Sequence, residues 1–258
     1  MITPKFPMDC QFDFENKSVL VTGAGRGVGA EIAKMFWNSG ANVAFTDVDP
    51  SSAQSTAESV DAKQERSLWH PLDVRKKSSF ETVLELMVKR WGRVDIVVNN
   101  AGHAKRTPVQ EISVDEFDEI VAINMRSVFL SCQVFGPHMR KNAYGRIINI
   151  TSLAGQNGGT VASAHYSAAK AGATMLSKYF AQDLAGSGVT VNAISPGPIS
   201  TAKERLSADQ IKMIEGRVPI GRFMETSEIS SAVALLASDQ GGFFMGATLD
   251  MNGGLLIR

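Results

Sequence analysis

Residues 17–29 read Lys-Ser-Val-Leu-Val-Thr-Gly-Ala-Gly-Arg-Gly-Val-Gly, and this stretch decides the fold. The run Ser18-Val-Leu-Val-Thr22 has the length and the apolar content of a buried strand. From about Val28 to Ser39 the apolar residues recur with helical spacing instead. A cluster of glycines separates the two segments. The stretch therefore predicts a strand, a tight glycine turn and a helix, which together are the first unit of an α/β fold.

The same alternation of strand and helix continues along the chain. The runs Asp95-Ile-Val-Val98 and Ile147-Ile-Asn-Ile150 are nearly continuous in apolar residues, as expected of parallel strands that are buried on both faces. The predicted strands are Ser18–Thr22, Asn42–Thr46, Ser67–Leu72, Asp95–Asn99, Arg146–Thr151, Val189–Ile194 and Thr248–Met251. The predicted helices span about 28–39, 51–62, 78–91, 113–140, 164–185 and 227–237. We expect a Rossmann-type, doubly wound, seven-stranded parallel sheet with helices on both faces.

Nothing in the sequence divides the chain into separate parts. It has no internal repeat, no low-complexity tract and no linker rich in proline, glycine and serine, so residues 1–258 are expected to form a single domain. Residues 1–13 are interpreted as an N-terminal arm. Residues 198–218, with prolines and glycines close by and a short helix near 207–214, are predicted to form a lid over a substrate.

The charge balance and the cysteine count exclude several classes of protein. The 26 basic and 26 acidic residues give a formal net charge of zero, which lacks the basic surface that nucleic-acid binding requires. The longest uncharged apolar stretch, Ile229–Ser238, is far shorter than the roughly 18 residues of a membrane-spanning helix. Cys10, Cys132 and the four histidines have no disulfide or metal-ligand spacing. We expect a cytoplasmic protein with no metal, no nucleic acid partner and no membrane partner.

The glycine turn has the character of an anion-binding loop. Glycines there allow the backbone to turn tightly and to approach a pyrophosphate at the positive end of the following helix. Asp47 ends the second strand, 18 residues after Gly29, where a carboxylate can bind the hydroxyls of an adenosine ribose. Asp73, after the third strand, would then lie beside the adenine. The alternative interpretation of Asp73, a solvated helix cap, has almost equal weight.

A second motif lies in the other half of the chain. Tyr166 and Lys170 are four residues apart in a helix-compatible segment, so both side chains project from one face. An ammonium beside a phenol in a partly desolvated cleft lowers the pKa of the phenol, which makes it usable as an acid or a base. Ser152 ends the fifth strand, at the sheet edge where open α/β folds bind ligands.

These motifs together resemble the short-chain dehydrogenase/reductase family, from about Phe14 to Gly254. The resemblance also includes Asn99-Asn-Ala-Gly102 and the Pro196-Gly197 pair. It implies an active oxidoreductase with a catalytic tetrad of Asn124, Ser152, Tyr166 and Lys170. The residues that it implies for cofactor binding are Gly23, Arg26, Gly27, Val28, Gly29, Asp47, Asp73, Val74, Asn100, Ala101, Gly102, Tyr166, Lys170, Pro196, Gly197, Ile199 and Thr201.

The roles of the four tetrad residues are implied by the resemblance alone. Tyr166 would be the general acid and base, and Ser152 would polarise the substrate oxygen. Lys170 would lower the pKa of the tyrosine and hold the nicotinamide ribose, and Asn124 would anchor a water molecule in a proton relay. The cofactor itself would carry the hydride.

Asp47 predicts NAD rather than NADP, because the 2′-phosphate of NADP would bring a further negative charge close to its carboxylate. Arg26, within the glycine loop, is the evidence for NADP, which remains the alternative cofactor. The resemblance also implies a homotetramer.

The substrate is predicted from three loops. Their polar side chains favour a small alcohol or ketone of the sugar, polyol or hydroxy acid type; these side chains are His103, Lys105, Arg106, Gln156, Asn157 and His165. The first alternative is an enzyme like the family's 3-oxoacyl-acyl carrier protein reductases, in which two arginines dock the acidic carrier; an ungapped alignment around the tetrad places Ala143 and Gln182 at these positions. The second alternative is a non-catalytic, dinucleotide-binding redox sensor on the same fold.

Overall fold

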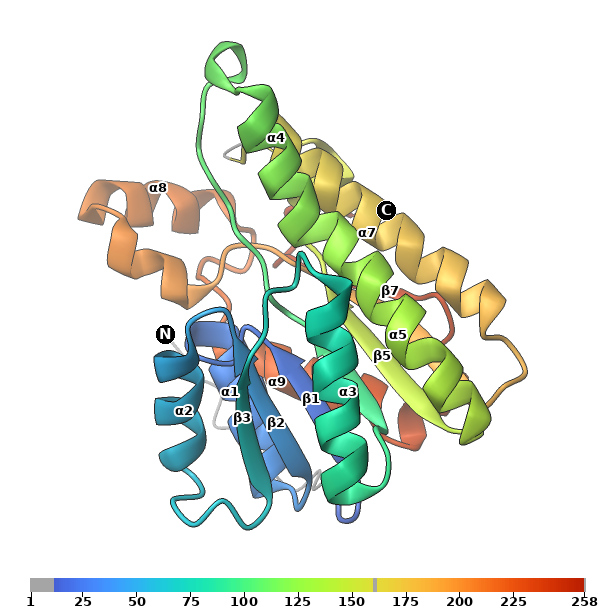
Figure 1. The fold of residues 1–258 in the computed structure, drawn as a ribbon. Helices are drawn as coiled ribbons and strands as arrows, with labels where there is room; N and C mark the ends of the chain where they lie inside the picture. The colour runs from blue at the N-terminus through green and yellow to red at the C-terminus, as the bar shows by residue number, and fades with distance from the viewer. Residues whose placement is uncertain (1–11, 160–161, 258) are drawn as a thin grey trace.

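The computed structural model describes residues 12–159 and 162–257, so the predicted N-terminal arm and Cys10 lie almost entirely outside the described residues. Seven strands form one parallel sheet in the order β3-β2-β1-β4-β5-β6-β7 (Figure 1). The strands are β1 (Ser18–Thr22), β2 (Asn42–Asp47), β3 (Ser67–Pro71), β4 (Ile96–Asn99), β5 (Gly145–Ile150), β6 (Val189–Pro196) and β7 (Thr248–Met251). The predicted doubly wound, seven-stranded parallel sheet is confirmed.

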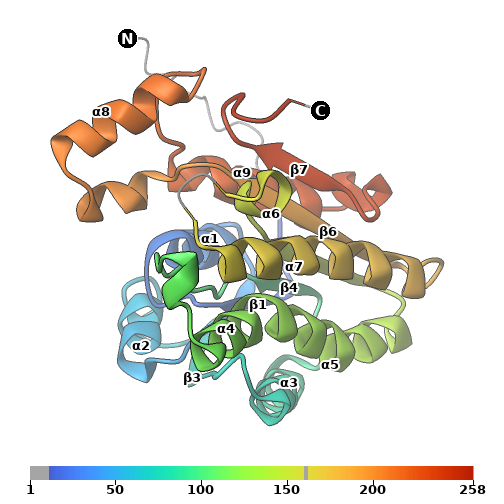
Figure 2. The same cartoon turned by 90° about the horizontal axis from the view of Figure 1, so that it is seen from above.

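Helices connect successive strands and cover both faces of the sheet. The α-helices are α1 (Gly27–Asn38), α2 (Pro50–Glu58), α3 (Lys77–Trp91), α4 (Val114–Val121), α5 (Ser127–Lys141), α6 (Ala154–Asn157), α7 (Ala164–Asp183), α8 (Ala208–Arg217) and α9 (Thr226–Ala237). Short helical turns are η1 (Val109–Glu111), η2 (Ala122–Arg126), η3 (Ser200–Arg205) and η4 (Gln240–Phe243). In Figure 2, α1, α2 and α9 lie on one side of the sheet and α3, α5 and α7 on the other.

Two apolar cores lie on the two faces of the sheet. Alternate residues of each strand enter opposite cores: Val19 and Val21 pack with α1 and α9, whereas Leu20 packs on the side of α3, α5 and α7. All three side chains are fully buried. A strand that is buried on both faces has no polar face, which explains why these strands read as apolar runs in the sequence.

The predicted helix over 113–140 is continuous through α4, η2 and α5, but η2 is a π-helical turn centred on Asn124. This helix, Val114–Lys141, is long and apolar enough by length and composition to cross a membrane. Half of its apolar window is buried inside the protein, where Val128, Phe135 and Met139 belong to the core on the α3 side. The packing explains its apolar composition as that of a core helix.

Two glycines of the first turn are required for different reasons. Gly23 has φ +65°, in the left-handed region that favours glycine. At Gly29 a Cβ atom would lie 2.0 Å from the carbonyl oxygen of Gly23 and 2.4 Å from the side chain of Asn100. The turn therefore brings helix α1 closer to the end of β1 than any side chain would allow.

We predict that Gly29→Ala destabilises the protein by about 1–3 kcal/mol, because the new methyl group meets backbone that cannot move without disturbing the sheet. Gly216→Ala is the control: Gly216 lies within α8, nothing lies within 4 Å of its Cβ position, and alanine is the better helix former. Urea unfolding of both variants measures the difference. Equal stability of the two variants would contradict the packing role of Gly29.

Candidate active site

The start of α1 is built to receive an anion. Arg26 occupies the N-cap position in an extended conformation, and within the described chain no side chain accepts a hydrogen bond from the first turn of the helix. The first turn also contains no acidic residue. Open N–H groups under a glycine loop fit the pyrophosphate of a dinucleotide. Gly27, with φ +56°, faces open space, and its nearest neighbour is the Thr201 side chain at 3.9 Å from the Cβ position.

Thr22 and Asn100 join the glycine loop to the end of β4. The Thr22 hydroxyl accepts hydrogen bonds from the backbone N–H groups of Asn100 and Ala101, each at 3.0 Å. The side-chain amide of Asn100 donates to the carbonyls of Thr22 at 3.0 Å and Gly23 at 3.2 Å. Strand order reverses between β1 and β4, so these contacts lie at the switch point where doubly wound sheets bind ligands.

Asp47 lies at the end of β2 and contacts the glycine loop. One carboxylate oxygen accepts a hydrogen bond from the N–H of Gly25 at 3.1 Å, and the other accepts from the N–H of Asp49 at 3.2 Å. Asp49 caps α2 by accepting from the N–H of Ser51. Two carboxylates therefore lie beside the glycine loop, at the position where the sequence predicts the adenosine ribose.

Asp73 is engaged by its neighbours. Arg75 donates two side-chain hydrogen bonds to it, at 2.8 and 2.9 Å, and Lys76 lies 3.6 Å away. The hydrogen bond from Arg75 is the largest cause that lowers the pKa of Asp73 to about 2. The carboxylate thus stabilises the turn before α3, and a contact with adenine would use the lone pairs that remain. The predicted site residues Val28, Val74, Ala101 and Ile199 all pack against the cores, which leaves mainly their backbone groups for a cofactor.

The four tetrad residues lie together beyond the ends of β4 and β5. A Cβ on Gly102 would lie 3.0 Å from the Asn124 side-chain oxygen and 3.4 Å from Lys170 Nζ, so these two groups flank the same glycine. The Ser152 side chain lies close enough to the Tyr166 phenol to lower its pKa. Lys170 Nζ is 5.8 Å from the centre of the Tyr166 ring and donates to the carbonyl of Ile150 at 2.8 Å.

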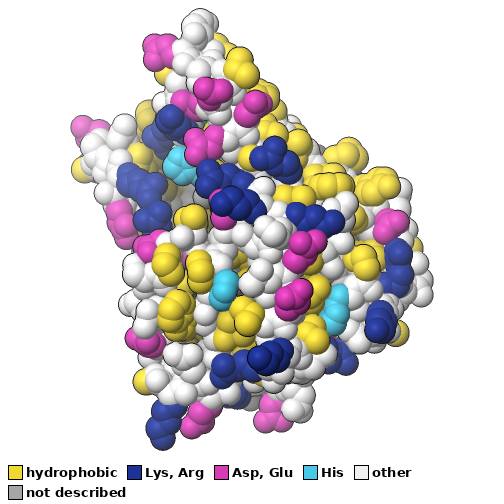
Figure 3. Space-filling model, in the orientation of Figure 1, with side chains coloured by type: hydrophobic (Ala, Val, Ile, Leu, Met, Phe, Trp, Pro, Cys, Tyr) yellow, Lys and Arg dark blue, Asp and Glu magenta, His cyan; other side chains and the backbone are white. Residues whose placement is uncertain are grey.

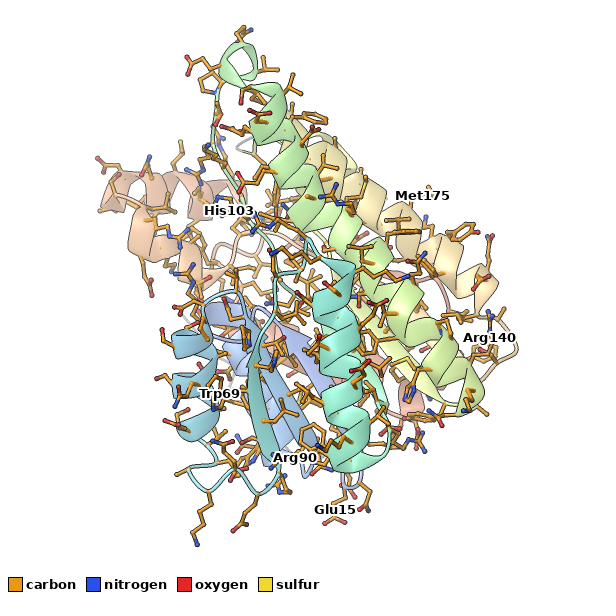
Figure 4. The ribbon with its side chains drawn as sticks, viewed as in Figure 1. Glu15, Trp69, Arg90, His103, Arg140 and Met175 are labelled. Atoms are coloured by element: carbon orange, nitrogen blue, oxygen red, sulfur yellow. The ribbon has the colours of Figure 1, made fainter. Side chains whose placement is uncertain are left out.

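Asn124 owes its position to the π-helical turn. Its side-chain amide donates to the carbonyl of Ile120 at 3.0 Å and to the carbonyl of His103 at 2.8 Å, and its oxygen accepts from the N–H of His103 at 3.2 Å. Figure 4 shows His103 on the loop between β4 and α4. A π-turn inserts an extra residue into the helix, and such turns are frequent at functional sites. The sequence pattern gave no signal for it.

Burial is the main influence on the pKa values of Tyr166 and Lys170, the two ionisable residues of the tetrad. The expected lowering of the Tyr166 pKa is not what the structure shows: burial raises the pKa of this phenol, and the hydrogen bond with Ser152 opposes the rise. Burial also lowers the pKa of Lys170 to about 8. The ammonium of Lys170 is surrounded by protein rather than water, which disfavours its charged form, and Lys170 is not among the causes that shift the pKa of Tyr166.

The segment predicted to form a lid begins beside the tetrad. Leu153 N–H donates to the carbonyl of Pro196, and Gly197 N–H donates to the carbonyl of Met251, both at 2.9 Å. These bonds tie the end of β6 to the loop that carries Ser152. After these contacts, Ile199 forms a parallel β-bridge with Met224. The segment between them, which contains η3 and α8, therefore begins and ends at the same point of the fold. A capping box of Ser207 and Gln210 starts α8, near the predicted short helix.

Most of the polar residues expected to bind substrate already have partners inside the protein. Lys105 pairs with Glu116 at 2.6 Å, Asn157 accepts from the N–H of Gly159, and Gln156 donates to Ser195 at 2.8 Å. His165 is completely buried. Within the described ranges, only His103 and Arg106 of the expected six have side chains without a hydrogen bond or ion pair. Figure 3 shows a group of basic side chains around the histidine near the top of the molecule.

We predict that Lys170→Met stabilises the protein by about 2 kcal/mol at pH 7. The ammonium titrates near 10.5 in an unfolded chain and near 8 here, a difference worth about 3 kcal/mol, from which the lost hydrogen bond to Ile150 subtracts about 1 kcal/mol. The cost of the charge is absent above pH 10.5 and grows as the pH falls to about 8. Urea unfolding should therefore show a gain at pH 7 that nearly vanishes at pH 10; the same gain at both values would contradict this account.

Comparisons with known proteins agree with this geometry. A family model described as enoyl-(acyl carrier protein) reductase matches residues 23–256. The 3-oxoacyl-[acyl-carrier-protein] reductase FabG of Escherichia coli is 40% identical over 248 residues, which cover 95% of this chain and 99% of that protein. The corresponding FabG of Staphylococcus epidermidis is 37% identical over 245 residues, covering 94% of this chain and 100% of that protein.

A solved structure has the same fold over almost the whole chain. It is a short-chain dehydrogenase/reductase from Brucella melitensis, titled glucose/ribitol dehydrogenase, with a TM-score of 0.86 and 30% identity. The two structures match over 96% of this chain and 99% of the other. With the glycine loop, the switch-point contacts and the tetrad in one place, the chain belongs to the short-chain dehydrogenase/reductase family and is a nicotinamide-dependent oxidoreductase that acts on a keto or hydroxyl group.

Proposed function

We propose that the protein reduces the 3-oxo group of an acyl thioester to a 3-hydroxyl group. The observation that carries the proposal is the 40% identity with a 3-oxoacyl-[acyl-carrier-protein] reductase over nearly the full length of both chains. This replaces the small polar substrate, which the sequence patterns favoured, with the alternative. The engaged partners of Lys105, Gln156 and His165 support the change, because they remove polar groups that would have bound a sugar.

Three of the four tetrad residues receive a role from their contacts. Bound reduced nicotinamide dinucleotide supplies the hydride. Tyr166, beside Ser152, donates the proton to the oxygen of the reduced carbonyl, and the Ser152 hydroxyl orients and polarises that oxygen. Lys170 is held by the Ile150 carbonyl on the same side as Asn124, where it favours the phenolate that remains after proton transfer.

A polyol or sugar is the second candidate substrate. The specific observation in its favour is the structural match to the Brucella protein titled glucose/ribitol dehydrogenase. His103 and Arg106 remain available to hydrogen-bond hydroxyl groups or a carboxylate. The lower sequence identity of this match, 30% against 40%, places it second.

Exposed apolar side chains support the expected homotetramer. Phe129 on α5 and Met175 on α7 are 39% and 62% exposed on neighbouring helices. At the other end of the chain, Phe243 and Ile257 are almost fully exposed. Exposed apolar patches of this kind mark association surfaces. The tetramer and the cytoplasmic location stay predictions. Light scattering of the purified protein tests the tetramer.

NAD is the proposed cofactor, and Asp47 is the proposed selecting residue. Its carboxylate is fixed by Gly25 and Asp49, and Asp49 adds a second negative charge beside it. A 2′-phosphate about 4 Å away would be repelled by roughly 1 kcal/mol in water and about 4 kcal/mol at an effective dielectric near 20. Arg26 opposes this preference in part, but its charge also acts on Asp49, whose pKa is lowered mainly by the hydrogen bond from the Ser51 side chain and to a smaller extent by Arg26.

We predict that kcat/KM, measured at 340 nm, is at least about tenfold higher for a 3-oxobutanoyl thioester than for the best sugar, polyol or hydroxy acid. The side chains of Lys105 and Gln156 already bind Glu116 and Ser195, so they add little binding energy for the hydroxyl groups of such a substrate. Oxoacyl carrier protein, the free thioester, sugars, polyols and hydroxy acids should be assayed with both cofactors. A higher value for a sugar or polyol would put the second candidate first.

We predict that Tyr166→Phe lowers kcat by about 10²–10⁴-fold, because the ring is retained while the exchangeable proton is lost. Binding of the nicotinamide cofactor, followed by its fluorescence, should be unchanged. Tyr179→Phe is the matched control on the same helix, since Tyr179 is an exposed side chain nine residues beyond Lys170. Near-normal turnover of Tyr166→Phe would refute the role of the phenol.

We predict a preference for NAD over NADP between about fivefold and a thousandfold in kcat/KM, from the repulsion energies above at 1.4 kcal/mol per decade. Asp47→Asn should reduce this ratio at least fivefold, because it removes the charge but keeps an oxygen that can accept from the N–H of Gly25. The ratio is measured by steady-state kinetics with both cofactors. A wild-type preference for NADP, or a ratio that the substitution leaves unchanged, would be evidence against Asp47.

A further inference from the structure

The start of α7, which carries Tyr166, lacks its ordinary cap. Ser163 is the N-cap residue, but its hydroxyl makes no hydrogen bond with the helix. The hydroxyl is directed to the loop between β4 and α4 instead: it lies 2.8 Å from the carbonyl of Lys105, 3.0 Å from the carbonyl of Thr107 and 2.8 Å from the N–H of Thr107. The first turn of α7 therefore needs another acceptor for its free N–H groups.

His165 supplies that acceptor at the catalytic residue itself. The backbone N–H of Tyr166 donates to His165 Nδ1 at 2.9 Å. Because a backbone N–H can only donate, Nδ1 carries no proton, and the proton of the neutral imidazole must be on Nε2. Nε2 lies 3.0 Å from a carboxylate oxygen of Glu116, to which it donates. The contacts of both ring nitrogens thus define a single tautomer.

Glu116 connects this histidine to the loop beside the site. Its second carboxylate oxygen is 2.6 Å from Lys105 Nζ, and the hydrogen bond from Lys105 is the largest cause that lowers the pKa of Glu116 to about 2. Phe117, next to Glu116 on α4, lies with its ring 6.5 Å from the imidazole. Figures 1 and 2 both show α4 beside α7, so the chain Lys105, Glu116, His165 crosses directly from the loop to the catalytic helix.

We propose that His165 is a positioning residue for Tyr166, and that Glu116 and Lys105 couple the loop over 103–108 to it. The proposal rests on the proposed catalytic role of Tyr166. The phenol oxygen lies at the far end of its side chain, so a small rotation of the backbone at Tyr166 moves this oxygen further than the backbone itself. A misplacement of about 1 Å can reduce turnover about 10²-fold.

Three substitutions of His165 separate its two hydrogen bonds. His165→Asn keeps an acceptor near the position of Nδ1 but cannot reach Glu116. His165→Gln can reach Glu116 but leaves the Tyr166 N–H without its acceptor. His165→Leu loses both contacts. We expect kcat to fall about 10- to 100-fold in the Leu and Gln variants and less than about threefold in the Asn variant, with the cofactor Kd unchanged in all three.

Substitutions of Glu116 test the coupling to the loop. Glu116→Gln keeps an acceptor for Nε2 and weakens the contact with Lys105, so we expect KM to rise more than kcat falls. Asp118→Asn is the matched control, since it removes one charge from an exposed position on the same helix and should change neither constant. Equal effects of the two substitutions would overturn the coupling.

A second measurement does not depend on any substrate. The chain has three tyrosines, so protein labelled with ¹⁵N-tyrosine gives three backbone amide signals, and Tyr144 and Tyr179 serve as internal references. We expect the Tyr166 amide to exchange with solvent at least about tenfold faster in His165→Leu than in wild type or His165→Asn. An unchanged exchange rate in His165→Leu, or losses of kcat that follow the melting temperature and not the acceptor, would overturn the proposal. If the wild type reduced no substrate, the proposed function would fail, and the amide signals would still decide the positioning role.

Discussion

The hydrogen bonds between the ends of β1 and β4 are the constraint on which the site depends. The Thr22 hydroxyl and the Asn100 amide together satisfy four backbone groups at the point where the sheet reverses its order. Each group left without a partner there would cost about 1–3 kcal/mol. The same bonds fix the glycine loop relative to Gly102, and Gly102 in turn lies against Asn124 and Lys170. The glycine loop and the proposed catalytic residues are therefore held by the same set of hydrogen bonds.

The arrangement of strands could be predicted because burial on both faces leaves a strong signal. Val19, Leu20 and Val21 enter two different cores, so a run of apolar residues identifies the strand without any polar alternation. All strands run in parallel, and their carboxyl ends therefore meet at one edge. For that reason alone, Ser152 at the end of β5 could be expected near the glycine turn at the end of β1, although 130 residues separate Ser152 from Thr22.

The partners of the loop side chains could not be predicted in this way. Lys105, Gln156 and His165 look equally available in the sequence, but each is engaged in the structure with a residue from a different segment. Periodicity reports which face of an element is buried and carries no information on how irregular loops meet. Glu116 and Ser163 were missed for the same reason: their spacing is that of ordinary helix residues, and only the packing of α4 against α7 gives them a role.

The pKa values of Tyr166 and Lys170 show that burying these two side chains costs stability. A lysine at the surface would stay charged without a desolvation cost. Its side chain would be solvated and mobile, however, so the distance between its ammonium and the phenol would vary. Here burial lowers the pKa of Lys170 to about 8 and raises that of Tyr166, so both charged forms are disfavoured in the protein alone. The Ile150 carbonyl and the apolar sheet beneath it fix the ammonium in place. The fold thus gives up stability at Lys170 in return for a fixed geometry, and the apolar cores on both faces of the sheet must offset that loss.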